Sequence, residues 1–364
     1  MRSIMNANRL HLLLPFALPA AADASTALYS LDTPALDKLV ARATLVERVI
    51  GEDFQRTLPH ERWVARSFGA VPAGSAAADE APLAPYMLLA DGGQPGDATW
   101  ACVQPVHVRI AHDHLVLIDP ASLELADGDA RALFDVARPL IEELGVRVEA
   151  PQPSRWYLSS DAFGTLAGAS PLRASGRNIE IWLPHEAHTG ERSRAWMKLQ
   201  NEVQMAWFEH PVNEARESRG LPAVNSIWFH AQGAAQPVRS DFTRVLSDTA
   251  ATRGLALAAK ASTGAPPAAF GAWRSDSTGN SATLIELDPF SAPFIEQDWG
   301  RWNAAFAALE RDWFAPALAA LQAGELGELG LTLCGDTGSV TLNITRGDLR
   351  KFWRRRLFAS LFIE

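Results

Sequence analysis

Cysteine and long apolar runs are scarce in this chain. Only two cysteines occur among 364 residues, Cys102 and Cys334, and neither a Cys-x-x-Cys pair nor a Cys/His cluster with zinc-ligand spacing is present. A disulfide scaffold and a structural zinc domain are therefore excluded. Both cysteines lie in apolar, strand-like runs, so we expect buried free thiols. No apolar run approaches the roughly 18–20 residues of a membrane-spanning helix, which excludes a polytopic membrane protein and predicts no transmembrane segment.

Positive charge is also in deficit. The chain has 33 Lys and Arg against 42 Asp and Glu, a net charge of -9 at pH 7. Because binding along a phosphate backbone needs clustered cations, we expect no nucleic-acid partner. The exception is the C-terminal stretch, where Arg350, Lys351, Arg354, Arg355 and Arg356 are interleaved with aromatic residues. We expect a helix here, which either carries solvated arginines or touches an anionic partner or membrane surface.

Familiar motifs of catalysis and nucleotide binding are missing. The sequence has no GxxxxGK[ST] loop, no GxGxxG after a strand, no GxSxG elbow, and no HExxH or DxDxDG motif. His112 and His114 could share one face of a strand, and His185 and His188 form a second loose pair. We favour an exposed hairpin turn for the first pair and a role without a metal for the second, so neither pair predicts a metal site.

The order of elements indicates an α/β protein with an insertion. A chain of 364 residues exceeds the roughly 250–300 residues at which single cores stop growing. Strands alternate with helices at both ends of the chain, which is typical of a mostly parallel sheet. We therefore predict an α/β core from residues 1–97 and 222–364, with an α+β domain inserted over residues 98–221.

The N-terminal segment has two interpretations. Residues 1–25 resemble a secretory signal because a short apolar stretch follows basic residues. However, Pro15 and Pro19 bracket the end of that stretch, which favours a first buried strand over residues 10–16 instead. We expect the strand and a cytoplasmic protein, and we keep an exported binding protein with a cleaved N-terminus as the alternative.

Hydrophobic periodicity and turn residues predict the remaining elements. Helices are expected over residues 34–43, 45–54, 129–144, 191–219 with a break at Pro211, and 299–321. Strands are expected over residues 86–90, 147–150, 155–159, 179–183, 226–231 and 283–287, with hairpins over 99–119 and 330–344.

The densest group of polar residues surrounds Pro211. One helical turn places Asn213 and Arg216 on the same face, and His210 and Asn225 flank them in the sequence. A guanidinium beside amide groups suits a phosphate or a carboxylate. The same residues could instead form a structural network that fixes a corner between helix and strand, and the sequence leaves both hypotheses open.

Three segments carry a resemblance to a known family. They are HPVNEARESRGLPAVNSIWFHAQG at residues 210–233, TPALDKL at 33–39 and QPGDA at 94–98. They resemble the archaeal-type, cofactor-independent phosphoglycerate mutases of the alkaline-phosphatase superfamily. The resemblance implies a core of alkaline-phosphatase type with an inserted domain that closes over the substrate.

A second resemblance covers nearly the full length. LLLPFALP at residues 12–19, RWYL at 155–158 and KFWR at 351–354 are similar to segments of proteobacterial proteins described as regulatory proteins of the RpfE type or as phosphoglycerate mutases. This resemblance implies a regulatory protein.

The departures from the mutase pattern concern its chemistry. The mutases use two metal ions, usually Mn²⁺ or Zn²⁺, and their first strand ends in a ligating aspartate. Here that strand runs into Pro15, Phe16 and Ala17, and no histidine follows His230 anywhere in the chain. Because a two-metal phosphoryl site needs several Asp and His ligands, we expect the fold to be retained and the mutase chemistry to be lost.

Our first hypothesis is thus a catalytically degenerate relative of these mutases. It would act as a regulatory or small-ligand-binding protein without catalytic residues or a resident metal, and its ligand would be small and anionic or phosphorylated. The alternative is an active phosphoglycerate mutase or phosphatase with relocated ligands for Mn²⁺ or Zn²⁺. The candidate ligand-binding residues are His210, Asn213, Arg216, Asn225, Arg155 and His185.

Overall fold

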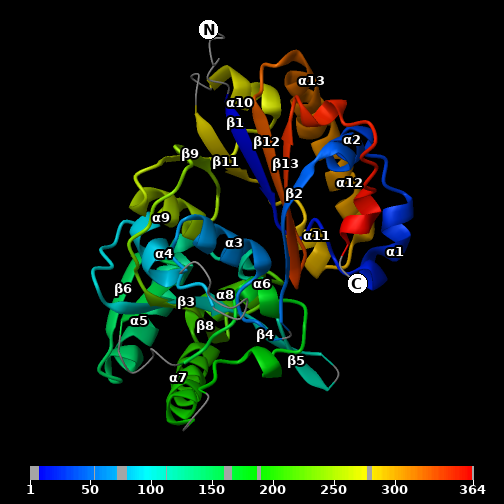
Figure 1. The fold of residues 1–364 in the computed structure, drawn as a ribbon. Helices are drawn as coiled ribbons and strands as arrows, with labels where there is room; N and C mark the ends of the chain where they lie inside the picture. Colours follow the sequence, from blue (N-terminus) through cyan, green and yellow to red (C-terminus); the bar gives the residue numbers. More distant parts are fainter. Residues whose placement is uncertain are drawn as a thin grey trace. The chain divides into compact units, whose positions relative to one another are not determined.

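The computed structural model divides the chain into two compact units (Figure 1). The first unit consists of the described residues within 1–53 and 239–364, and the second of those within 54–238. The described residues are 8–52, 54–71, 80–111, 113–159, 166–186, 190–276 and 281–362.

The first unit is built on a seven-stranded sheet of order β10-β9-β11-β1-β12-β13-β2. The five strands from β10 to β12 are mutually parallel, whereas β13 runs antiparallel to both of its neighbours. The predicted α/β class with a mostly parallel sheet is therefore confirmed. The strands are β1 (Arg9–Leu14), β2 (Thr44–Ile50), β9 (Arg244–Leu246), β10 (Ser262–Gly264), β11 (Ala282–Glu286), β12 (Glu328–Cys334) and β13 (Gly338–Thr345).

Helices connect these strands, and α2, α12 and α13 lie alongside β12, β13 and β2 in Figure 1. The α12 helix continues through a π-helical stretch, η4, into α13, which ends at Gly324 in the left-handed conformation (φ 80°) that glycine adopts without strain. The helices are α1 (Ala21–Tyr29), α2 (Pro34–Arg42), α9 (Ala250–Ala258), α10 (Phe270–Asp276), α11 (Ser291–Ile295), α12 (Trp299–Leu309), η4 (Glu310–Phe314), α13 (Ala315–Ala323), η5 (Asp348–Arg350) and η6 (Phe358–Leu361).

The β1 strand confirms the expected buried strand near the N-terminus. It lies between β11 and β12, with parallel pairing on both sides. Leu10, Leu12, Leu13 and Leu14 are all buried, because a strand in the middle of a parallel sheet is covered on both faces. His11 fits there as a neutral side chain whose Nε2 lies 2.8 Å from the hydroxyl of Thr332.

The second unit is an α+β arrangement around an antiparallel sheet of order β6-β7-β3-β8, with a separate β4–β5 hairpin. Its core contains buried aromatic side chains: Trp156 packs against Phe134 and Trp207, and Trp196 packs against Phe229. The elements are α3 (Pro59–Ser67), α4 (Ala84–Ala90), β3 (Thr99–Val106), β4 (Val108–Ala111), β5 (His114–Leu117), η1 (Pro120–Leu123), α5 (Asp127–Glu142), β6 (Arg147–Gln152), β7 (Arg155–Ser159), α6 (Pro171–Ala174), η3 (Glu180–Trp182), α7 (Glu191–Phe208), α8 (Pro211–Ser218) and β8 (Ser226–Ala234).

The boundaries between the two units differ from the predicted domain boundaries. The α+β unit extends beyond residues 98–221 on both sides, to residues 54 and 238. On the C-terminal side the reason is β8, which we placed in the core. It pairs antiparallel with β3 along residues 99–106 and so belongs to the sheet of the second unit.

Several predicted elements are confirmed and others are wrong. The break at Pro211 separates α7 from α8, and the hairpin over 330–344 corresponds to β12 and β13. The helix expected over 45–54 is instead the edge strand β2, which is rich in the β-branched residues that favour strands. The strand expected over 86–90 is helix α4, and the strand expected over 179–183 is the 3₁₀ turn η3. Of the hairpin expected over 99–119, the antiparallel pairing of residues 108–111 with 114–117 is confirmed by β4 and β5, whereas residues 99–106 form β3, which joins the four-stranded sheet.

The prediction of a basic C-terminal helix is also wrong. Between η5 and η6 the chain follows an irregular path. The guanidinium of Arg42 donates to the carbonyl oxygens of Lys351 and Arg354, which a continuous helix would have used for its own ladder. Both cysteines are buried free thiols, as predicted, and no described helix is long and apolar enough to cross a membrane.

The half-buried His11 makes the first unit sensitive to acid. Burial, together with the nearby Arg9, lowers the pKa of His11 to about 3. In the unfolded chain His11 therefore binds a proton below about pH 6.5, whereas in the folded chain it stays neutral down to about pH 3. The stability of the folded state is therefore not reduced by His11 above pH 6.5. Between pH 6.5 and about 3 the free energy of unfolding falls by about 1.4 kcal/mol per pH unit.

We predict that His11→Gln flattens the decline in stability between pH 6.5 and 4 by about one proton. Urea unfolding of the wild type and the variant across this range measures the effect, and His114→Gln on the β4–β5 hairpin serves as the control. An unchanged slope in His11→Gln would show that His11 is protonated in the folded protein.

Candidate functional site

The residues around Pro211 form a structural corner between α8 and β8. The side chain of Asn213 donates to the carbonyl of Val224 at 2.9 Å and accepts from its N–H at 2.8 Å. Arg216, which is fully buried, donates to the carbonyl oxygens of Pro222 at 2.9 Å and Leu123 at 2.6 Å. The ring Nδ1 of His210 accepts from a backbone N–H in the first turn of α8 and so caps this helix.

Asn225 continues this corner toward the β4 strand. Its side chain exchanges two hydrogen bonds of 2.8 Å with the backbone of Val108. Asn213 and Asn225 also line a cavity of about 780 Å³, whereas Arg216 is not among its lining residues. No described Lys or Arg lines this cavity, so the guanidinium needed to recognise an anion is turned to the backbone instead.

Arg155 lies apart from this corner, in β7. Its guanidinium makes two parallel hydrogen bonds to the carboxylate of Asp91, at 2.8 and 2.6 Å, and the hydroxyl of Tyr157 donates to the same carboxylate at 2.6 Å. Such a fork leaves the buried Asp91 fully satisfied. Burial and the neighbouring Cys102 and Asp91 raise the pKa of Tyr157 far above its usual value, so this group is a neutral donor.

His185 belongs to a third location. Its Nδ1 lies 3.1 Å from the guanidinium of Arg56, which also donates to the carbonyl oxygens of Trp182 and Leu183. Burial, followed by the positive charge of Arg56, lowers the pKa of His185. The six candidates therefore occupy three separate networks in the second unit: four at the α8–β8 corner, Arg155 in β7, and His185 beside Arg56.

Because Arg216 holds two backbone carbonyls, we predict that Arg216→Ala lowers the free energy of unfolding by about 2–4 kcal/mol. Arg219→Ala is the matched control, since this side chain is more than half exposed, and we expect it to change stability by less than about 0.5 kcal/mol. Chemical denaturation of the two variants measures both effects. A stable Arg216→Ala protein that loses a phosphate-dependent rise in melting temperature would instead identify Arg216 as a ligand-binding residue.

In the first unit, the carboxyl end of β1 is closed by aromatic side chains. The chain turns at Phe16, a non-glycine residue with φ of 53°, and buries Phe16, Ala17 and Leu18. The ring of Phe16 stacks on Phe294 with centroids 4.7 Å apart, and the indole of Trp302 donates to the Phe16 carbonyl at 3.0 Å. We call Phe16, Phe294, Trp302 and the adjoining Phe290 the aromatic cluster.

A pocket of about 560 Å³ opens beside this cluster, at the carboxyl ends of β9, β10 and β11, and we call it the carboxyl-edge pocket. Ligands of open α/β sheets bind at this edge. Glu286 is buried there and accepts hydrogen bonds from the hydroxyls of Ser247, at 2.6 Å, and Thr249. Asp248, Asp288 and Asp312 also line the pocket, and no Lys, Arg or His is present among its described lining residues.

The residues at this edge do not fit the two metal ions that the mutase resemblance implies. The donor set holds carboxylates and hydroxyls, and no histidine is among its described lining residues. In the part of the chain that the structure describes, no three His, Cys, Asp or Glu side chains are grouped so that they could hold a metal ion. We therefore derive no reaction step through metal ions.

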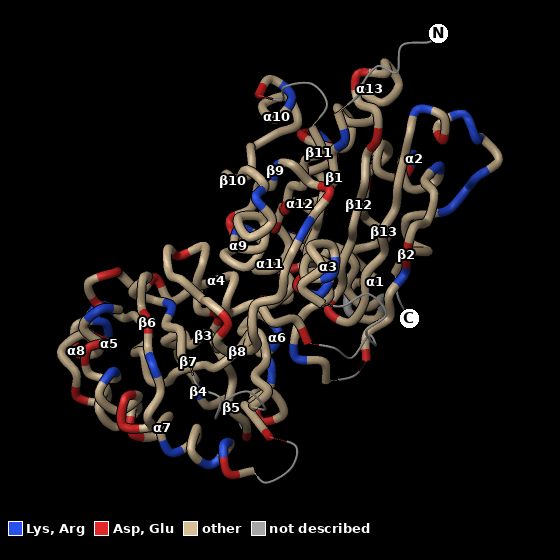
Figure 2. The backbone as a smooth tube through the Cα atoms, turned by 60° about the vertical axis from the view of Figure 1, so that its left-hand side comes forward, with Lys and Arg blue, Asp and Glu red and all other residues tan. Residues whose placement is uncertain are grey.

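A second pocket of the first unit, of about 490 Å³, is basic. Lys38 and Arg42 from α2 and the tail residues Arg354, Arg355 and Arg356 line it, and we call it the basic pocket. Figure 2 shows blue segments gathered in the chain beside α2. Sequence reasoning noted the basic tail but not the two α2 residues, because they lie more than 300 residues away along the chain.

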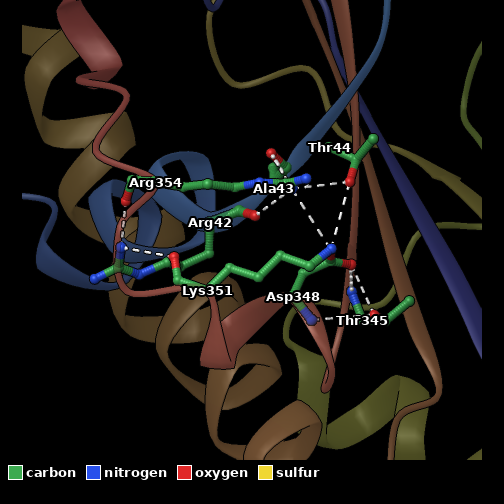
Figure 3. Close-up of polar contacts among 7 residues, drawn as sticks. All are labelled: Arg42, Ala43, Thr44, Thr345, Asp348, Lys351 and Arg354. Atoms are coloured by element: carbon green, nitrogen blue, oxygen red, sulfur yellow. Dashed lines mark hydrogen bonds and ion pairs between the residues drawn. The ribbon is translucent and has the colours of Figure 1, made fainter.

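Reciprocal hydrogen bonds fix this junction, as Figure 3 shows. Arg354 donates to the carbonyl oxygens of Arg42 and Ala43 and to the hydroxyl of Thr44 at 3.0 Å, while Arg42 donates back to the tail. Lys351 donates to Asp348 at 2.6 Å. Burial alone would raise the pKa of Asp348, but hydrogen bonds from Lys351 and its neighbours lower it overall, so its carboxylate stays charged.

Comparison with known proteins identifies the fold. No protein-family profile and no curated protein matches the chain. The PH0037 protein from Pyrococcus horikoshii aligns with a TM-score of 0.53 and 12% identity, over 98% of this chain and 92% of that chain. The cofactor-independent phosphoglycerate mutase from Thermoplasma acidophilum aligns with a TM-score of 0.47 and 14% identity, over 98% of this chain and 94% of that chain. The first similarity shows that this chain and the Pyrococcus protein share a fold.

Proposed function

We propose that this protein is a catalytically degenerate relative of the cofactor-independent phosphoglycerate mutases, and that it acts in the cytoplasm as a regulatory protein by binding a small anionic ligand. The observation that carries the proposal is the aromatic cluster at the end of β1. Where the mutase resemblance expects a metal-binding aspartate, Phe16 and Ala17 are buried, and Phe16 packs against α11 and α12. The regulatory role follows from the resemblance to the RpfE-type proteins.

The charge of the carboxyl-edge pocket supports the same proposal. Phosphoglycerate is multiply anionic, and a site that binds it must supply positive charge from metal ions, arginine or lysine. The described lining of this pocket instead includes Asp248, Glu286, Asp288 and Asp312. Four carboxylates without a lining cation repel a multiply charged anion, so phosphoglycerate is a poor ligand for this edge of the sheet.

The four carboxylates also favour one competing function. An active mutase or phosphatase could recruit Mn²⁺ or Zn²⁺ to these residues if they move closer together on binding the metal. This alternative makes Glu286 and Asp288 metal ligands, whereas our proposal leaves the pocket without a part in phosphoryl transfer.

We predict no interconversion of 2- and 3-phosphoglycerate by the purified protein, with Mn²⁺, with Zn²⁺ or after chelation. An active cofactor-independent mutase assayed in parallel verifies the conditions. Turnover that requires Mn²⁺, is abolished by Glu286→Gln and survives in the control Asp241→Asn would contradict the proposal and establish the competing enzyme.

A further inference from the structure

We propose that the basic pocket is a binding site for a phosphate-bearing ligand with at least two anionic groups. The inference deepens the proposed binding function and rests on it, because it assigns the ligand to a place that the sequence candidates do not occupy. The pocket brings together five cationic side chains in a protein whose net charge is -9.

Three of these cations have no counter-charge. Lys38, Arg355 and Arg356 make no hydrogen bond or ion pair with any described residue, and the Nη1 atom of Arg356 is buried without a partner. A buried, unpaired guanidinium nitrogen is costly, and an anion that enters the pocket would satisfy it. Lys38 and Arg355 are exposed to solvent, but five cations beside a single carboxylate differ from ordinary protein surfaces, which intersperse charges of both signs.

The other two cations are held in place before any ligand arrives. Arg42 and Arg354 use only their Nη1 groups in the hydrogen bonds that join α2 to the tail. The Nε and Nη2 groups of both side chains bond no described residue and can donate to phosphate oxygens. Planar guanidinium groups fixed in this way suit phosphate better than flexible ammonium groups, because less freedom is lost on binding.

One acidic side chain, Asp37, also lines the pocket. Burial and the neighbouring Asp32 raise the pKa of Asp37, so it accepts a proton more readily than an ordinary aspartate. A bound anion would raise that pKa further, and a protonated Asp37 would no longer oppose binding. The remaining wall includes Leu28, Leu31 and Phe358, and the volume of about 490 Å³ lies within the range of small-molecule sites.

Phosphate groups reach proteins either on soluble metabolites or on lipid headgroups, and one experiment with two arms separates these sources. Inorganic pyrophosphate, titrated calorimetrically in low-salt buffer, tests a free ligand. Co-sedimentation with vesicles containing 30% phosphatidylglycerol in phosphatidylcholine tests a headgroup; the exposed Phe352 and Trp353 next to the pocket would contact such a surface.

The test variant is Lys38→Gln/Arg356→Gln, which removes two charges that hold no other part of the structure. Lys38→Gln/Arg355→Gln replaces it if the first variant does not fold. The control is Lys260→Gln/Arg239→Gln, which removes the same charge from exposed positions of the same unit. We expect pyrophosphate to bind the wild type and the control equally, and the test variant at least tenfold more weakly.

Weakening of vesicle binding alone in the test variant would identify a lipid headgroup as the source of the phosphate. Equal binding of wild type, control and test variant in both arms, or no binding in either arm, would overturn the inference. Mutase turnover with intact pyrophosphate binding would contradict the proposed function and leave the pocket assignment standing, so the two failures are distinguishable.

Discussion

The hydrogen bond from the indole of Trp302 to the carbonyl of Phe16 fixes the end of the central strand, and much of the first unit depends on it. It ties α12 to the point where β1 leaves the sheet and holds Phe16 in a backbone conformation that few side chains adopt. From there the aromatic contacts continue through Phe306 to Phe358, at the start of η6. The same packing that closes the carboxyl end of β1 therefore anchors the tail that forms one wall of the basic pocket.

Opposite charges occupy two different pockets of this unit. Carboxylates gather at the carboxyl edge of β9 and β11, whereas lysine and arginine gather between α2 and the tail. A phosphorylated molecule is repelled by the first pocket and attracted by the second. In the fold that this chain shares with the Pyrococcus protein, the proposed ligand thus binds away from the edge of the sheet where α/β folds usually bind theirs.

Much of the fold could be predicted from the sequence because its signals are local. The apolar residues of β1, the break at Pro211 and the turn between β12 and β13 are signals that depend on only a few neighbouring residues. The β2 strand could not be predicted, because its apolar residues lie on an exposed edge and its partner β13 is almost 300 residues away. The prediction of a helix in the tail was wrong for a related reason, because carbonyl groups of the tail accept hydrogen bonds from Arg42, which is more than 300 residues away.

From the sequence, the candidate residues around Pro211 could be predicted only to form a structural corner between a helix and a strand. Helical spacing correctly placed Asn213 and Arg216 on one face of α8, but it could not show that the backbone bonds the Asn213 amide and the Nε and Nη2 groups of Arg216. The basic pocket depends on contacts between α2 and the tail, which no local pattern reveals.

The most direct test of this account is a crystal structure of the protein soaked with Mn²⁺ and 3-phosphoglycerate, with data collected at the manganese absorption edge. We predict phosphate density between Lys38 and Arg356, and no manganese peak beside Glu286. A pair of manganese ions at the carboxyl ends of β9 and β11, with phosphoglycerate bound across them, would contradict the account.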